Sequence, residues 1–285
     1  MNDSSLRLEQ FDIKNIHGDT IRTDVRFTEN KEKHPVIIIC HSFMAFKNWG
    51  FFPYLASQLA LNGYVSVIFN FSLNGVSGDG NRITDFERFS RNTFSRELED
   101  IAAIVDACTS ESLIKTVGNI DRIALMGHSR GGGIAIVHAA SDSRIKALAT
   151  YSSISTFDRW REHQKNYWRT NGFLPLSRDT AASPLRLGRE LLRDYEEHSE
   201  RLNILQAASQ ITCPWLIVHG KADVTVSSKE AEALFAASKN GIGELELVEH
   251  AGHLFNAASP GEDGYKNLNH VIEKTIQFFK RTLQE

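Results

Sequence analysis

The stretch that decides the fold is "RIALMGHSRGGGIAIVHAA" (residues 122–140). An apolar run typical of a buried strand enters the motif "GHSRG" (127–131), and small and apolar residues typical of a helix follow it. In a G-x-S-x-G motif the serine lies on a strained, sharp turn, and the flanking glycines relieve the crowding that this turn creates. The helix N-terminus behind the serine offers free N–H groups to developing negative charge. The stretch therefore predicts Ser129 as a nucleophile.

The rest of the chain alternates between segments typical of strands and segments typical of helices. Apolar or alternating runs predict strands over residues 6–15, 20–29, 35–40, 64–71, 122–127, 145–153, 215–220 and 243–250. Amphipathic runs predict helices over residues 52–63, 93–110, 132–141, 228–238 and 264–284. The first two strands form an expected antiparallel hairpin at one edge. We predict an α/β fold with a mostly parallel, twisted sheet of about eight strands flanked by helices.

Residues 154–210 interrupt this alternation. They contain no run typical of a buried strand, and their amphipathic stretches indicate two or three helices. A connection of 57 residues is far longer than the usual link of about 2–6 residues between neighbouring elements. We predict that residues 154–210 form a helical cap, inserted at the carboxyl edge of a core made of residues 1–153 and 211–285.

A nucleophilic serine needs a base, and the base needs a carboxylate that orients it. After a G-x-S-x-G motif the expected chain order is serine, acid, histidine. Asp223 follows the strand at 215–220, and His253 follows the strand at 243–250. The carboxyl ends of parallel strands meet at one edge of a sheet, so these two loops should be neighbours. The sequence predicts Asp223 as the acid and His253 as the base.

Each of these two residues has a rival. His250 lies at the end of the last strand, whereas His253 follows an Ala-Gly turn that lets it reach toward the serine. Asp158 follows the strand at 145–153 but falls within the first part of the predicted cap. We therefore favour His253 over His250 and Asp223 over Asp158.

Four motifs together resemble the α/β-hydrolase superfamily: "HSF" (41–43), "GHSRGG" (127–132), "HGKADVTV" (219–226) and "HAGHLF" (250–255). Within it the chain is similar to single-domain serine esterases of the dienelactone-hydrolase and cinnamoyl or feruloyl esterase kind. The resemblance implies Ser129 as nucleophile, His253 as general base and acid, and Asp223 as its orienter. It also implies an oxyanion hole formed by the N–H of Arg130 and an N–H from residues 42–44, where we favour Phe43.

The superfamily usually has His-Gly where this chain has His41-Ser42. Glycine reaches positive φ without cost, whereas serine does so only under strain, so we expect Ser42 to be strained. Met44 is the alternative source of the loop N–H. The residues predicted to contact substrate are Ser42, Met44, His128, Phe157, Trp160 and Trp168, although packing at the elbow is the simpler role for His128.

The predicted cap holds a dense set of aromatic residues: Phe157, Trp160, Tyr167, Trp168 and Phe173. Most would seal the cap onto the sheet, and some would form a pocket for an apolar or aromatic group. We expect a carboxylesterase-type serine hydrolase that cleaves small to medium esters through an acyl-enzyme, without a metal or an organic cofactor. A thioesterase or a small amidase or peptidase is the alternative, although the chain has no N-terminal propeller of the oligopeptidase kind. A non-catalytic binding protein on a hydrolase scaffold is the other.

Composition excludes some partners. A net charge of −3 argues against generic nucleic-acid binding. No apolar stretch reaches the roughly 20 residues that span a bilayer, and the polar N-terminus lacks a signal core. The three cysteines show no metal-ligand spacing, so we expect buried thiols and a cytoplasmic location. We expect a small-molecule ester as the partner, and the sequence leaves open whether the chain forms a homodimer.

Overall fold

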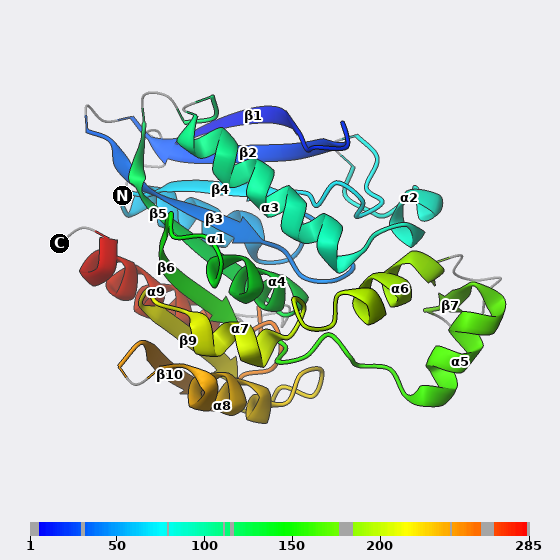
Figure 1. Cartoon of the computed structure of the whole chain (residues 1–285). Helices are drawn as coiled ribbons and strands as arrows, with labels where there is room; N and C mark the ends of the chain where they lie inside the picture. The colour runs from blue at the N-terminus through cyan, green and yellow to red at the C-terminus, as the bar shows by residue number, and fades with distance from the viewer. Residues whose placement is uncertain are drawn as a thin grey trace.

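The computed structural model describes residues 6–29, 32–78, 80–110, 112–114, 117–176, 185–239, 241–257 and 265–283. Within these residues eight strands form one twisted sheet at the centre of the molecule (Figure 1). They are β1 (Leu6–Lys14), β2 (Thr20–Thr28), β3 (His34–Cys40), β4 (Val65–Phe69), β5 (Gly118–His128), β6 (Ile145–Tyr151), β9 (Trp215–Gly220) and β10 (Gly243–Val248). The helices around them are α1 (Phe52–Leu61), α2 (Phe86–Ser90), α3 (Phe94–Thr109), α4 (Arg130–Ala139), α8 (Ser228–Ala237) and α9 (Lys266–Leu283).

The strand order explains where a site can form. It runs β1-β2-β4-β3-β5-β6-β9-β10, with β1 antiparallel to β2 and β2 antiparallel to β4. The six strands from β4 to β10 are mutually parallel, so their carboxyl ends meet at one edge. The predicted mostly parallel sheet with a hairpin at one edge is therefore confirmed.

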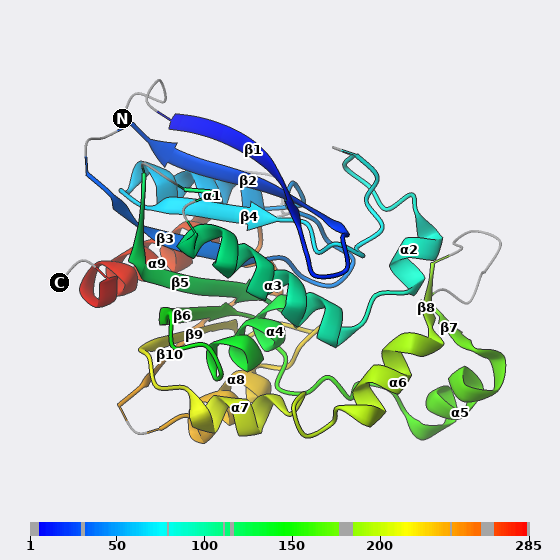
Figure 2. The same ribbon diagram turned by 45° about the horizontal axis from the view of Figure 1, so that its top comes forward.

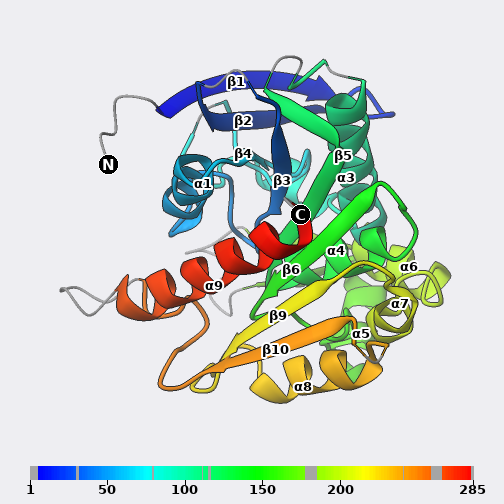
Figure 3. The same ribbon diagram turned by 90° about the vertical axis from the view of Figure 1, so that its left-hand side faces the viewer.

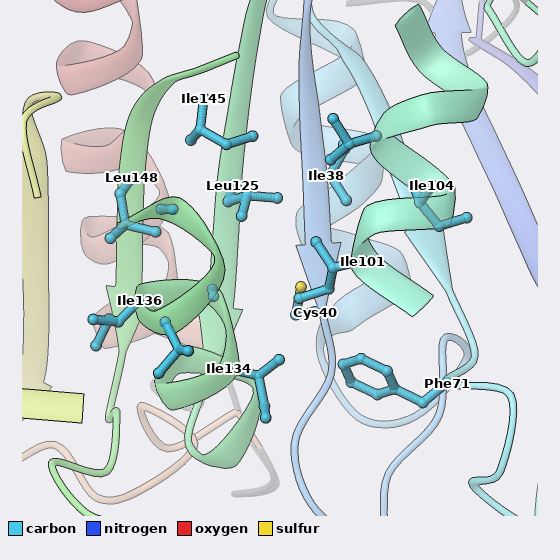
Figure 4. Close-up of a cluster of buried hydrophobic side chains, with 14 of the residues drawn as sticks. Ile38, Cys40, Phe71, Ile101, Ile104, Leu125, Ile134, Ile136, Ile145 and Leu148 are labelled. Atoms are coloured by element: carbon cyan, nitrogen blue, oxygen red, sulfur yellow. The ribbon is translucent and has the colours of Figure 1, made fainter. Parts of the chain in front are cut away.

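Helices cover both faces of the sheet. Figure 3 shows α1 and α9 on one face and α3, α4 and α8 on the other. Alternate side chains of β3 enter two separate cores: Ile37 and Ile39 pack toward α1 and α9, while Ile38 and Cys40 pack toward α3 and α4. Figure 4 shows Ile38 and Cys40 beside Ile101 of α3. Burial on both faces is why this strand has a continuous apolar sequence.

The region predicted as a cap holds α5 (Glu162–Asn171), β7 (Phe173–Pro175), β8 (Arg186–Gly188), α6 (Arg189–Glu197) and α7 (Ile204–Gln210). The prediction of helices missed the short antiparallel ribbon of β7 and β8. Figure 2 shows α5, the ribbon and α6 projecting beyond the edge of the sheet. In contrast, α7 packs against α4 and α8. The division into a core and a cap at residues 154 and 210 stays a prediction.

The three cysteines are free and buried. Burial raises the pKa of Cys108 to about 12 and that of Cys213 to about 11, so both thiols are protonated and unreactive. The expected buried thiols are thus present. Across the described ranges, no helix has both the length and the apolar character needed to cross a membrane.

Candidate active site

Ser129 lies between the last residue of β5 and the first residue of α4. Its backbone has φ 55° and ψ −119°, a conformation that a non-glycine residue rarely adopts. Four main-chain hydrogen bonds hold it there. Its N–H donates to Tyr151 O at 2.8 Å, and its carbonyl accepts from the N–H groups of Gly132 at 3.0 Å and of Gly133 and Ile154 at 3.3 Å. The strained turn that the motif predicts is present.

The motif glycines are required by close packing. A Cβ atom at Gly127 would lie 2.3 Å from the carbonyl oxygen of Gly131. A Cβ atom at Gly131 would lie 2.3 Å from His41 O and 2.6 Å from Cys40 O. Any side chain at these positions would collide with backbone, so the turn packs directly against the start of the loop after β3.

Asp223 and His253 meet across the ends of β9 and β10. His253 Nδ1 donates to Asp223 Oδ2 at 2.7 Å, and Asp223 Oδ1 accepts from the N–H groups of Thr225 and Val226. Burial raises the pKa of Asp223, but hydrogen bonds from His219, His253 and the Val226 N–H outweigh it and hold the pKa below its ordinary value. An ionised Asp223 fixes the Nδ1–H tautomer of His253 and leaves Nε2 free to accept a proton.

The link from base to nucleophile is open in this structure. Among the described residues, no hydrogen bond joins Ser129 Oγ to His253. Catalytic hydrogen bonds are often long in free enzymes and shorten when substrate binds. The two side chains extend from segments that follow parallel strands at the same edge of the sheet.

The rival residues have other partners. His250 is exposed, has φ 58°, and accepts a hydrogen bond on its carbonyl from Asn256 Nδ2. Asp158 accepts from Lys165 Nζ at 2.6 Å in the region predicted as a cap. The structure therefore brings His253 to Asp223 and leaves both rivals outside this arrangement.

The loop after β3 differs from the expectation in one respect. Ala45 N–H donates to Ser42 O, which closes a turn over residues 42–45, and positive φ (58°) falls on Met44. The prediction that Ser42 carries the strain is wrong, because the third residue of this turn takes the left-handed conformation. In the described part of the chain, the N–H groups of Phe43, Met44 and Arg130 have no hydrogen-bond acceptor.

Buried polar contacts anchor this loop on both sides. His41 Nδ1–H donates to Ser42 O at 2.9 Å, and His41 Nε2 accepts from the N–H of Phe71. Lys47 is 2% exposed, and its Nζ donates to Asp24 Oδ1 of β2 at 2.5 Å. The sequence does not predict the Lys47–Asp24 contact. Lysine and aspartate usually lie on the surface, and these two come from segments that are distant in the chain.

A cavity of about 250 Å³ adjoins the nucleophile. Its walls are formed by Phe43, Phe94, Ser129, Arg130, Ile154, Phe157, Arg159, Trp160, Thr225 and Val226. Phe157 and Trp160 thus lie where the prediction of substrate contact puts them. Ser42 and Met44 are not among the lining residues; Ser42 is buried in the turn, and Met44 is 42% exposed.

Two residues predicted to contact substrate lie elsewhere. Trp168 is fully buried, donates Nε1–H to Gly188 O at 3.0 Å, and packs behind Trp160 with ring centroids 5.1 Å apart. His128 is 2% exposed, and its Nε2 lies 2.9 Å from His253 O. Neither side chain lines the cavity, because Trp168 faces the interior behind Trp160 and His128 faces the loop of the base.

The charged groups at the cavity are paired. Arg130 Nε donates to Glu97 Oε2 at 3.0 Å, and its guanidinium lies 5.1 Å from the ring centroid of Phe43 and 4.5 Å from that of Phe94. Arg159 Nη1 donates to both carboxylate oxygens of Glu230. Sequence reasoning missed Glu97 and Phe94, since the start of α3 shows only an ordinary amphipathic pattern.

Comparisons with known proteins concern the family and the fold of the chain. A family model described as the prolyl oligopeptidase family matches residues 49–285. The 31.7 kDa protein of the traX-finO intergenic region in Escherichia coli is 25% identical over 268 residues, which is 83% of this chain and 89% of that protein.

Two solved structures have a similar fold. The α/β hydrolase GrgF from Penicillium sp. sh18 has a TM-score of 0.72 at 18% identity, covering 98% of this chain and 100% of the other. Est1E from Butyrivibrio proteoclasticus, solved with ferulic acid bound, has a TM-score of 0.70 at 19% identity, covering 96% of this chain and 99% of the other. These likenesses establish the fold expected from the motifs.

Proposed function

The chain belongs to the prolyl oligopeptidase family of α/β hydrolases, and from that premise we propose that it cleaves carboxylic esters with small to medium acyl groups. The observation that carries the proposal is Ser129 on a strained turn beside a cavity of about 250 Å³. The Asp223–His253 pair lies at the same sheet edge, and the N–H groups of Phe43 and Arg130 have no acceptor among the described residues. These groups would supply the other parts that acyl transfer needs.

The proposed reaction has two steps. Ser129 Oγ attacks the carbonyl carbon while His253 Nε2 takes the proton, and the N–H groups of Phe43 and Arg130 hold the oxyanion. His253 then protonates the leaving alcohol and activates water, which releases the acid from Ser129. Loss of one oxyanion donor typically costs about 10²–10³ in rate.

The cavity walls favour an uncharged, apolar or aromatic acyl group. Four aromatic rings line the space, contributed by Phe43, Phe94, Phe157 and Trp160. Each arginine in the wall is paired with a carboxylate, Arg130 with Glu97 and Arg159 with Glu230, while Arg130 Nη2 has no hydrogen-bond partner in the described part of the chain. The likeness to Est1E, solved with ferulic acid bound, supports an aromatic substrate.

The family match favours a second candidate, the cleavage of an amide or peptide bond. The same nucleophile, base and oxyanion donors serve esters, thioesters and amides, and the leaving group decides between them. A third candidate, a binding protein without turnover, predicts no activated serine. Labelling with a fluorophosphonate tests this candidate, because only a serine activated by a base reacts rapidly.

A substrate panel tests the proposal. We would measure kcat/KM for p-nitrophenyl esters of increasing acyl length, aryl esters, an acyl-CoA and an aminoacyl p-nitroanilide. We expect the highest values for short or aromatic esters. Trp160→Ala should alter the preference for acyl length, because Trp160 lines the cavity, while the matched variant Tyr167→Ala should not, because Tyr167 is 44% exposed and outside it. Equal activity across the panel, or anilide cleavage above ester cleavage, would contradict an esterase.

A further inference from the structure

His128 is a buried histidine that the reaction scheme leaves unused. It is the last residue of β5 and directly precedes the nucleophile. Its Nε2 lies 2.9 Å from the main-chain oxygen of His253. A carbonyl oxygen only accepts hydrogen bonds, so Nε2 must carry a proton, and the bond runs from the nucleophile's neighbour to the backbone of the base.

The surroundings keep His128 neutral. Its ring is packed edge-on against Phe51 and Phe52, and its centroid lies 4.7 Å from that of His253. Burial, with a further contribution from nearby His253, lowers the pKa of His128 to about 3. A neutral ring bonded through Nε2–H has a single tautomer, so this donor is present at neutral pH.

The base sits on a loop that needs an external anchor. Residues 249–257 follow β10 without forming a helix or strand, and three of them, His250, Phe255 and Asn256, have positive φ. The first half of the loop is tied to the segment after β9 through the N–H of Ala222, which donates to Ala251 O at 2.9 Å. The bond from His128 holds the loop at the base itself.

We propose that His128 is a positioning residue: its Nε2–H bond to His253 O sets the distance between the imidazole of His253 and the hydroxyl of Ser129. The proposal rests on the proposed serine-hydrolase function and assigns a further residue to it. His128 does not line the cavity, so its loss should affect the transfer of the proton and leave substrate binding unchanged. A misplacement of about 1 Å in such a contact costs on the order of 10²-fold in rate.

Two amide variants separate the hydrogen bond from the packing of the ring. In His128→Gln the amide nitrogen reaches about as far as Nε2, whereas in His128→Asn it reaches only as far as Nδ1. We expect the Gln variant to keep kcat within about threefold of the unmodified chain. We expect the Asn variant to lose at least about tenfold in kcat, with KM changed by less than about twofold. His128→Leu, which has no donor, should behave as Asn does.

The readout is the second-order rate of fluorophosphonate labelling at Ser129, measured beside kcat and KM on the best ester. Labelling needs the base but no particular substrate, and thermal unfolding of each variant shows that it is folded. If His128→Leu does not fold, the comparison rests on His128→Gln and His128→Asn alone.

Three outcomes would overturn the proposal. If His128→Asn and His128→Leu were labelled at the rate of the unmodified chain, the positioning role would be contradicted and the proposed hydrolase function would stand. If His128→Gln were labelled as slowly as His128→Asn, the imidazole ring would matter and the hydrogen bond would not. An unmodified chain that is not labelled at all would overturn both this role and the proposed function, since no activated serine would exist to be positioned.

Discussion

The molecule contains the dipeptide His-Ser at the ends of two neighbouring strands, and the two copies have become different structures. His41-Ser42 follows β3, and His128 is the last residue of β5, with Ser129 directly after it. Both histidines are buried and donate to a main-chain carbonyl. The serines differ: Ser129 itself has positive φ, while after Ser42 the positive φ falls on Met44.

The difference teaches that neighbours decide what the same pair of residues becomes. After Ser129 the glycines allow backbone to touch backbone, and Gly131 packs against the carbonyl of His41. After Ser42 the chain turns through Phe43 and Met44, whose N–H groups have no acceptor in the described part of the chain. One turn presents a hydroxyl group, and the other presents N–H groups.

The largest contrast should appear when each hydroxyl is removed. We expect Ser129→Ala to lose at least about 10⁴-fold in kcat on the best ester, because the nucleophile is gone. Ser42→Ala should stay within about tenfold of the unmodified chain, since the loop acts through its main chain. Steady-state kinetics on both purified variants would check this. Similar losses of kcat in the two variants would contradict the different roles assigned to Ser129 and Ser42.

A smaller effect is expected on the stability of the fold at acid pH, which depends on buried His41 staying neutral. Burial lowers the pKa of His41 from 6.5 to about 4, so the unfolded chain binds a proton that the folded protein excludes. The stability that depends on neutral His41 is therefore complete above pH 6.5 and is lost as the pH falls toward 4. At pH 5 the loss amounts to roughly 2 kcal/mol.

Urea unfolding at pH 7 and pH 5 measures this loss. His41→Asn should show a smaller drop between the two pH values than the unmodified chain, because the titrating group is absent. His250→Asn is the control, since His250 is exposed, and its drop should match that of the unmodified chain. Equal drops for His41→Asn and the control would show that His41 does not govern acid stability.

The smallest contrast tests where the strain lies in the first turn. Met44→Gly should leave stability unchanged or raise it by up to about 1 kcal/mol, because glycine adopts positive φ freely and the Met44 side chain is 42% exposed. Ser42→Gly should lower stability by about 0.5–1 kcal/mol, because it adds flexibility where no positive φ is needed. Free energies of unfolding from urea titrations would show the reverse order if Ser42 were the strained residue.

Much of the site could be predicted because its parts lie at the ends of recognisable strands. The apolar runs of β5, β9 and β10 mark where each strand stops, and Ser129, Asp223 and His253 follow those stops. Their common position at one edge of the sheet then follows, because the carboxyl ends of parallel strands share an edge. The glycines around Ser129 were predictable for the same reason, since crowding at a sharp turn is a local effect.

Other parts could not be predicted, because they depend on side chains that meet from distant segments. Glu97 lies under Arg130 because α3 packs beside α4. Trp168 is hidden behind Trp160 because of the way the helix α5 packs against the ribbon of β7 and β8. Nothing in the local sequence of these residues distinguishes a wall of a cavity from the interior behind it.

The sequence by itself determined the fold class, the position of the turn that holds Ser129 and the strand ends that Asp223 and His253 follow, because these rest on hydrophobic periodicity and on turns that need glycine. The tertiary structure decided which aromatic rings meet the cavity, that Met44 carries the positive φ, and that His128 Nε2 lies within hydrogen-bond distance of the main-chain oxygen of His253. The physical reason is the distance along the chain over which each effect acts. Periodicity and backbone sterics act within a few residues, whereas burial and hydrogen-bond pairing depend on groups brought together only when the chain has folded.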